Sequence, residues 1–154
     1  MLGQQYQEYD KNADFGGFDM SYPIEEIEGI GPTYGAKLKD AGVSSTAALL
    51  KACAKKSGRK KVAEDTGISE KLILEWTNLA DLMRIKGIGK QFSELLEAAG
   101  VDTVKELRNR NPENTAAKMA EVNAEKKLTR AVPAASMVAD WVAQAKKMDP
   151  IIEY

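Results

Sequence analysis

Two five-residue segments of the chain contain residue types that suit phosphate binding through the backbone. They read Ile-Glu-Gly-Ile-Gly at 27–31 and Ile-Lys-Gly-Ile-Gly at 85–89, and a segment with helical spacing follows each. The first amides of a helix have no partner within it and form the positive end of its dipole, so glycines let an anion approach them. The central isoleucine of each loop is expected to point inward, toward a core. The candidate phosphate-binding residues in the loops are Gly29, Ile30, Gly31, Gly87, Ile88 and Gly89.

The charged residues beside the two loops differ. Arg84, Lys86 and Lys90 surround the second loop, and three cations at a helix start are unfavourable unless an anion is bound. The first loop is preceded or occupied by glutamates, which repel a phosphate, and Lys37 lies further along its helix. A third candidate contact with a nucleic-acid backbone is the basic stretch 51–61, whose alternative role is a solvated face. The candidate residues there are Lys55, Lys56, Arg59, Lys60 and Lys61.

The residue inventory excludes several classes of enzyme. The chain has 154 residues, no histidine and a single cysteine, Cys53. A Ser–His–Asp triad, a Cys–His dyad, a histidine zinc site and a four-cysteine zinc or iron–sulfur site therefore cannot form within it. Its carboxylates are scattered without the pairing typical of acid–base catalysis, and Cys53 is expected in a core. We expect a non-enzymatic protein with no catalytic residue, no cofactor and no metal.

The two loops belong to an internal repeat. Tyr34 matches Phe92 at an offset of 58, and Trp76 matches Trp141 at an offset of 65 because the second copy carries an insertion. Each copy has about 60 residues, which is too long for a solenoid unit and suits a small helical bundle. The expected fold is all-α, a duplicated small bundle with an irregular N-terminal arm. Its expected divisions are the arm 1–21, the repeats 22–83 and 84–148, and the tail 149–154.

Capping residues predict where the helices begin and end. Proline suits the first turn of a helix, so Pro23 and Pro32 are expected at two helix starts. Hydroxyl side chains at Ser44 or Ser45, at Ser69 and at Thr103 are expected to cap helices. Glycines at 42, 67 and 100 are expected to end them. The helices after the first loop are predicted at 32–41, 46–56, 60–65, 70–83, 90–99, 103–109, 113–122 and 133–147.

The repeated pattern resembles the helix-hairpin-helix family. The segments that carry the resemblance are IEGIGPTYGAKLKDAGV at 27–43 and IKGIGKQFSELLEAAGV at 85–101. The wider arrangement, including the phrase LADLMRIKGIG at 79–89, looks like an uncharacterised bacterial family of tandem helix-hairpin-helix domains over roughly residues 22–148. The resemblance implies that paired hairpins contact both strands of double-stranded DNA across the minor groove without reading sequence. Thr33 stands where the family often has a basic residue, and such hairpins also serve as protein-docking elements.

The formal net charge of −1 conceals an asymmetry along the chain. Residues 1–28 contain seven acids and one lysine, residues 149–154 contain two acids, and the body between them carries 21 basic and 14 acidic residues. A basic body favours a polyanionic partner. Aromatic residues concentrate near the ends, which suggests that the arm docks on a partner, on a second copy or on its own body. The candidate arm residues are Tyr6, Tyr9, Phe15, Phe18, Tyr22 and Tyr154.

Two functions from different classes remain open at this stage. The first is sequence-independent binding of double-stranded DNA through the two loops. The second is a structural assembly or linker subunit that joins protein partners into a larger complex or filament, with self-association through the N-terminal arm included. The start of the chain lacks the features of a signal peptide and no apolar run is long enough for a membrane span, so we expect a cytoplasmic protein without membrane insertion.

Overall fold

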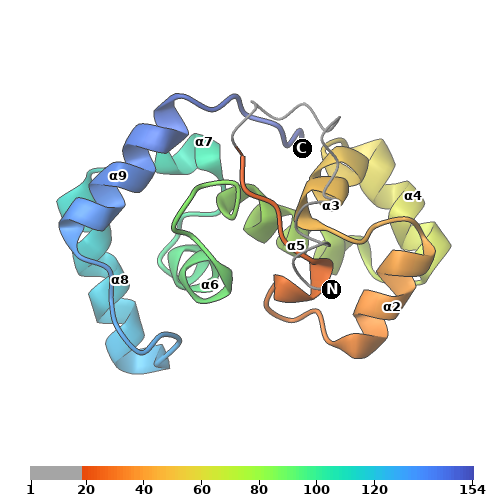
Figure 1. Cartoon of the computed structure of the whole chain (residues 1–154), viewed down its shortest axis with the longest axis horizontal. Helices are drawn as coiled ribbons and strands as arrows, with labels where there is room; N and C mark the ends of the chain where they lie inside the picture. Colours follow the sequence, from red (N-terminus) through yellow and green to blue (C-terminus); the bar gives the residue numbers. More distant parts are fainter. Residues whose placement is uncertain (1–18) are drawn as a thin grey trace.

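A computed structural model describes residues 19–154, and its regular elements are all helices. No β-strand occurs among these residues, and an isolated bridge joins Pro23 to Ser45. The all-α class predicted from the sequence is confirmed. The elements in chain order (Figure 1) are the 3-10 helix η1 (Ile24–Glu26) and the α-helices α2 (Pro32–Asp40), α3 (Thr46–Cys53), α4 (Lys56–Thr66), α5 (Glu70–Leu82), α6 (Lys90–Ala98), α7 (Val104–Leu107), α8 (Pro112–Lys126) and α9 (Ala135–Lys146).

The predicted capping residues occupy the helix ends. Ser45, Ser69 and Thr103 each accept a hydrogen bond from the backbone N–H three residues later, which satisfies one of the unpaired donors of the first turn. Gly42, Gly67 and Gly100 have φ values of 86°, 74° and 93°, the left-handed region that a glycine adopts without strain. The caps and the glycines therefore set the helix boundaries through local chemistry.

The helix predicted at 46–56 is wrong in its extent, because the chain breaks into α3 and α4 there. Arg59 is buried and donates from Nη1 to the carbonyls of Cys53 and Ala54, at 3.0 and 3.1 Å. These bonds satisfy carbonyls that the end of α3 leaves without helical partners. A β-carbon at Gly58 would lie 1.9 Å from the Ala52 carbonyl oxygen, so the glycine allows α4 to approach α3 closely.

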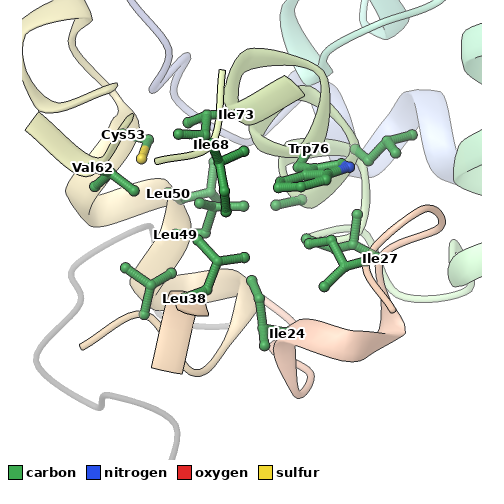
Figure 2. Close-up of a cluster of buried hydrophobic side chains, with 14 of the residues drawn as sticks. Ile24, Ile27, Leu38, Leu49, Leu50, Cys53, Val62, Ile68, Ile73 and Trp76 are labelled. Atoms are coloured by element: carbon green, nitrogen blue, oxygen red, sulfur yellow. The ribbon is translucent and has the colours of Figure 1, made fainter. Parts of the chain in front are cut away.

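The apolar side chains form two hydrophobic cores, one in each half of the described chain. The first core surrounds Trp76 and includes Ile24, Ile27, Leu49 and Cys53 (Figure 2), and burial raises the pKa of the Cys53 thiol to about 11. The second core surrounds Trp141 and includes residues of α6, α7, α8 and α9. Leu82 belongs to the second core and the next residue, Met83, to the first. The end of α5 therefore contributes to both halves, which lie at opposite ends of the longest axis (Figure 1).

Each half contains the same backbone hydrogen bonds, between residues that correspond at an offset of 58. The amide of each central isoleucine bonds to the carbonyl three residues earlier, at 3.1 Å in both copies: Ile30 to Ile27 and Ile88 to Ile85. The amide after each glycine-terminated helix bonds to a leucine carbonyl five residues earlier, at 2.8 Å for Val43 and 2.9 Å for Val101. Sequence correspondence between the copies therefore extends to their backbone geometry. No helix in the described part of the chain is long and apolar enough to span a membrane.

Candidate functional site

Each Gly-Ile-Gly loop turns sharply and is fixed to its core by its central isoleucine. Gly29 and Gly87 have φ values of 93° and 103°, and each opens the turn. Ile30 and Ile88 are 4% and 0% exposed, as the sequence predicted, so their side chains serve to hold the loops. The buried isoleucine side chain therefore holds the backbone of each loop in place against the core.

A tryptophan supports each loop from within. Trp76 approaches Gly29 so closely that a β-carbon there would lie 3.4 Å from the indole Nε1, and the corresponding distance from Gly87 to Trp141 is 2.9 Å. Each indole also contacts the aromatic residue of the following helix, with ring centroids 5.1 Å apart for Tyr34 and 5.3 Å apart for Phe92. These contacts explain why both tryptophans recur in the repeat.

The helices that follow the loops each have a glycine at the N-cap position, so no side chain caps their first turns. Gly31 precedes α2 and Gly89 precedes α6, and neither start has a side-chain capping bond. Both glycines have negative φ values, −85° and −106°, and a β-carbon at either would meet no atom within 4 Å. The fold therefore leaves room for a side chain at both positions, and the backbone there is open to a ligand.

The two loops lie close together. Nζ of Lys90, at the start of α6, is 3.7 Å from Oε2 of Glu28 in the first loop. Both side chains are nearly half exposed. Burial and the negative charge of Glu28 raise the pKa of Glu94 on α6, which is a second sign of this proximity. The sequence predicted the two loops but not that Glu28 would face Lys90.

Glu25 and Lys39 neutralise one another beside the first loop. Their side chains form an ion pair, and Glu25 folds over Gly35, where a β-carbon would lie 3.2 Å from Cγ of the glutamate. Partial burial is the largest single influence and would raise the pKa of Glu25, but the hydrogen bond from Lys39, the backbone hydrogen bond of Glu25 and the charge of Lys39 together outweigh it, so the pKa is lowered. The first loop therefore has a balanced pair of charges beside it.

Gln144 of α9 clamps the second loop. Its side-chain oxygen accepts from the Lys86 amide and its nitrogen donates to the Lys86 carbonyl, both at 3.0 Å. The same nitrogen donates to Asp140 at 2.9 Å. The backbone of Lys86 is thus fixed while its exposed side chain remains available at a shallow hollow between Gly87 and α9.

Two of the basic side chains that were predicted to bind phosphate, Arg84 and Arg59, are buried and bond to groups of the chain itself. Arg84 is 1% exposed and forms ion pairs with Asp19 and Asp81, both at 2.7 Å. Arg59 is 4% exposed and serves the carbonyls at the end of α3. The spacing of Asp81 and Arg84, three residues apart across the end of α5, is the sequence signal for a structural ion pair.

The remaining basic candidates are exposed. Lys86, Lys90 and Lys37 lie at or after the loops. A second basic surface follows the end of α3 and the first half of α4, where Lys61 pairs with Asp65 at 3.2 Å. The exposed lysines of that surface are Lys51, Lys55, Lys56, Lys60 and Lys61.

The aromatic arm is described in part. Tyr6, Tyr9, Phe15 and Phe18 lie outside the described residues. The other two candidates, Tyr22 and Tyr154, both contact the chain's own body. Tyr22 is half-buried against the first core, and the Tyr154 hydroxyl bonds to Oδ1 of Asn78 at 3.0 Å while 69% of the residue stays exposed.

Comparisons with known proteins place the chain in a family without assigning an activity. Within residues 19–154, no group of three or more metal-ligating side chains could hold a metal ion. No curated protein and no solved structure matches the chain significantly. Residues 28–148, which contain both Gly-Ile-Gly segments and both tryptophans, match one family. The chain belongs to the family described as Domain of unknown function (DUF4332).

Proposed function

We propose that this protein binds the sugar–phosphate backbone of double-stranded DNA through its two Gly-Ile-Gly loops, without reading sequence and without catalysis. The observation that carries the proposal is the pair of open glycines, Gly31 and Gly89. Their backbone conformation and surroundings accept a side chain, so the fold does not explain the glycines. A phosphate that approaches the first amides of α6, and in α2 the amides that follow Pro32, explains them, because a β-carbon would obstruct it.

The adjacency of the loops supports contact with one duplex. A single helix start binds one phosphate weakly, whereas two starts held side by side bind two phosphates with the second contact made intramolecular. The Glu28–Lys90 distance of 3.7 Å brings the loops to one surface. Contacts of this kind fix orientation on the duplex and carry no sequence information. This arrangement also agrees with the resemblance to tandem helix-hairpin-helix domains.

The charges near the loops predict weak binding with a small salt dependence. Lys86, Lys90 and Lys37 attract phosphates, while Glu26 and Glu28 repel them. Each phosphate contact contributes a slope of about −0.9 in log K against log salt. Two to three contacts from the loops therefore give a slope of about −2 to −3, and the basic surface on α4 adds to it where the duplex reaches that far.

Alanine substitution of the open glycines tests the proposal. We expect Gly31→Ala and Gly89→Ala each to weaken binding of a labelled 20-base-pair duplex about tenfold, or ~1.4 kcal/mol, in fluorescence anisotropy at 50 mM salt. The melting temperature should change little, because the added methyl meets no neighbour. Unchanged affinity in both variants, or no binding by the wild type, contradicts the proposal.

A charge series with a matched control separates loop contacts from general attraction. Lys86→Glu and Lys90→Glu reverse charges beside the loop, while Lys105→Glu and Lys118→Glu make the same change at exposed positions on α7 and α8. We expect the first pair to weaken binding at least tenfold more than the second. Equal losses would mean that the duplex binds through net charge alone.

A second function, a structural subunit that docks proteins through the loop surface, is favoured by one specific observation. The Glu25–Lys39 and Glu28–Lys90 pairs neutralise charges beside the loops, which reduces attraction for a polyanion. Pull-down from lysate with and without nuclease discriminates the two functions. A protein partner that remains after nuclease treatment, and is lost on deletion of residues 1–21, supports the assembly role. Sedimentation of the full chain and of the deletion variant measures self-association directly.

A further inference from the structure

Arg84 lies where segments distant in the sequence meet. Its Nε donates to Asp19 and its Nη1 to Asp81, both at 2.7 Å, while Nη2 donates to the Asp149 carbonyl at 3.1 Å. The Arg84 carbonyl accepts from the Met20 amide at 2.9 Å. One buried guanidinium therefore holds the beginning of the described chain, the end of α5 and the segment after α9.

Asp81 extends this junction to the second half. Its Oδ1 accepts from Arg84, and its Oδ2 accepts from the amide of Val104 at 2.8 Å, at the start of α7. Charge-assisted hydrogen bonds of this length are strong and directional, and removing one partner leaves a buried charge uncompensated. The junction therefore depends on the directions of these hydrogen bonds as well as on the opposite charges of Arg84 and Asp81.

The C-terminal segment 149–154 runs from the second half to the first (Figure 1). It begins after α9, where Nη2 of Arg108 donates to the Met148 carbonyl at 2.9 Å. Ile152 packs against the first core, and the Glu153 amide donates to the Ala54 carbonyl at 2.7 Å. The segment therefore spans both halves, and Arg84 holds it at its first residue.

Arg84 also immediately precedes the second loop, whose first residue is Ile85. We propose that Arg84 is a positioning residue that, together with the segment 149–154, holds the two Gly-Ile-Gly loops at one fixed separation. Its consequence for DNA binding rests on the proposed function. Loosening the junction lets the halves rotate about the end of α5, so the two loops no longer meet two phosphates at once and the gain from paired contact is lost.

Spin labels at Ala36→Cys on α2 and Gln91→Cys on α6 measure the relative placement of the halves, and duplex affinity is measured without the labels. Both positions are exposed, and the wild type is the labelling control because its Cys53 is buried with a raised pKa. The variants are deletion of 149–154, Ile152→Ala and Arg84→Lys, which keeps the charge but loses the planar fork of donors. Ile151→Ala is the matched control, since its neighbour Ile152 is the residue that packs against the first core. Melting curves identify any variant that fails to fold.

We expect the width of the label-to-label distance distribution to increase at least twofold in the deletion and in Arg84→Lys, and less in Ile152→Ala. It should stay unchanged in Ile151→Ala. Duplex affinity should fall about tenfold in the deletion, toward that of a single loop. Unchanged distributions in both the deletion and Arg84→Lys overturn the proposal. A broadened distribution with unchanged duplex affinity supports the positioning role and overturns its consequence for DNA binding. If the wild type binds no duplex, the proposed function fails while the distance measurement still decides the role of Arg84.

Discussion

The two loops share one backbone and differ in what surrounds it. Glu28 and Lys86 occupy equivalent positions at the offset of 58, so the same turn carries opposite charges in the two halves. Gln144 clamps the second loop, and its counterpart at the offset of 65 is Leu79, which is buried in the first core. The two loops therefore have the same backbone geometry and different electrostatics.

This difference indicates which features the loop backbone depends on. The left-handed glycine, the buried isoleucine and the supporting tryptophan occur in both halves. The charge at the second position of the loop is reversed between the halves, Glu28 against Lys86, and the Gln144 clamp occurs in the second half. The shared features belong to the folding of the turn, whereas the differing ones adjust what the turn binds and how rigidly it is held.

The largest expected effects come from the two tryptophans. Trp76→Ala and Trp141→Ala each remove a side chain that is almost fully buried and that supports a loop. We expect each to reduce the free energy of unfolding by about 3–5 kcal/mol in urea titrations, with losses that agree within about 1 kcal/mol. A loss confined to one of the two variants would contradict the equivalence of the halves. Exposed Met137→Ala on α9 is the control and should cost far less.

Alanine at the left-handed glycines should distinguish the halves. Gly29→Ala costs about 1–2 kcal/mol because its φ of 93° strains a residue with a β-carbon. Gly87→Ala should cost about 2–3 kcal/mol, since its β-carbon also falls 2.9 Å from the Trp141 indole. Thermal and urea unfolding measure both. Equal costs would show that Trp141 moves aside freely, and Gly31→Ala serves as the unstrained control.

Local sequence chemistry was sufficient to predict most of the fold. The sequence predicts caps at Ser69, at Thr103 and at Ser44 or Ser45, of which the structure shows Ser45, because the bond from a first-turn amide to a hydroxyl involves neighbours three residues apart. The inward-pointing Ile30 and Ile88 followed from the loop pattern in the same way. Predictions failed where a distant or buried partner decides the outcome, as for Arg59, which divides α3 from α4.

The candidate site was less predictable than the fold. Arg84 resembled a phosphate contact because it precedes a loop, and its burial depends on Asp19, which lies 65 residues away. The pairing of Glu28 with Lys90 likewise depends on how the halves pack. Charge counts along the sequence overestimated the basic character of the loops, because they included a buried arginine and omitted the ion pairs.

Reversing one charge should make the first loop more like the second. Glu28→Lys places a lysine where the second loop has Lys86, and it releases Lys90 from its ion pair. We expect duplex affinity at 50 mM salt to rise about tenfold, or ~1.4 kcal/mol, with a steeper salt slope. Glu121→Lys is the matched control, because it breaks the similar Glu121–Lys118 pair on α8. A rise of the same size in the control would assign the effect to net charge.

The smallest expected effect concerns the clamp on the second loop. Gln144→Ala removes both hydrogen bonds to the Lys86 backbone, and we expect a cost of about 1 kcal/mol. Hydrogen exchange at the Lys86 amide should accelerate about fivefold as its acceptor is lost. Gln144→Glu keeps an acceptor for that amide but loses the donor to the Lys86 carbonyl. Its exchange rate at Lys86 should therefore lie between those of the wild type and Gln144→Ala. If exchange at Lys86 is unchanged in Gln144→Ala, the second loop is held by Ile88 and Trp141 alone, and the rigidity of the two loops is the same.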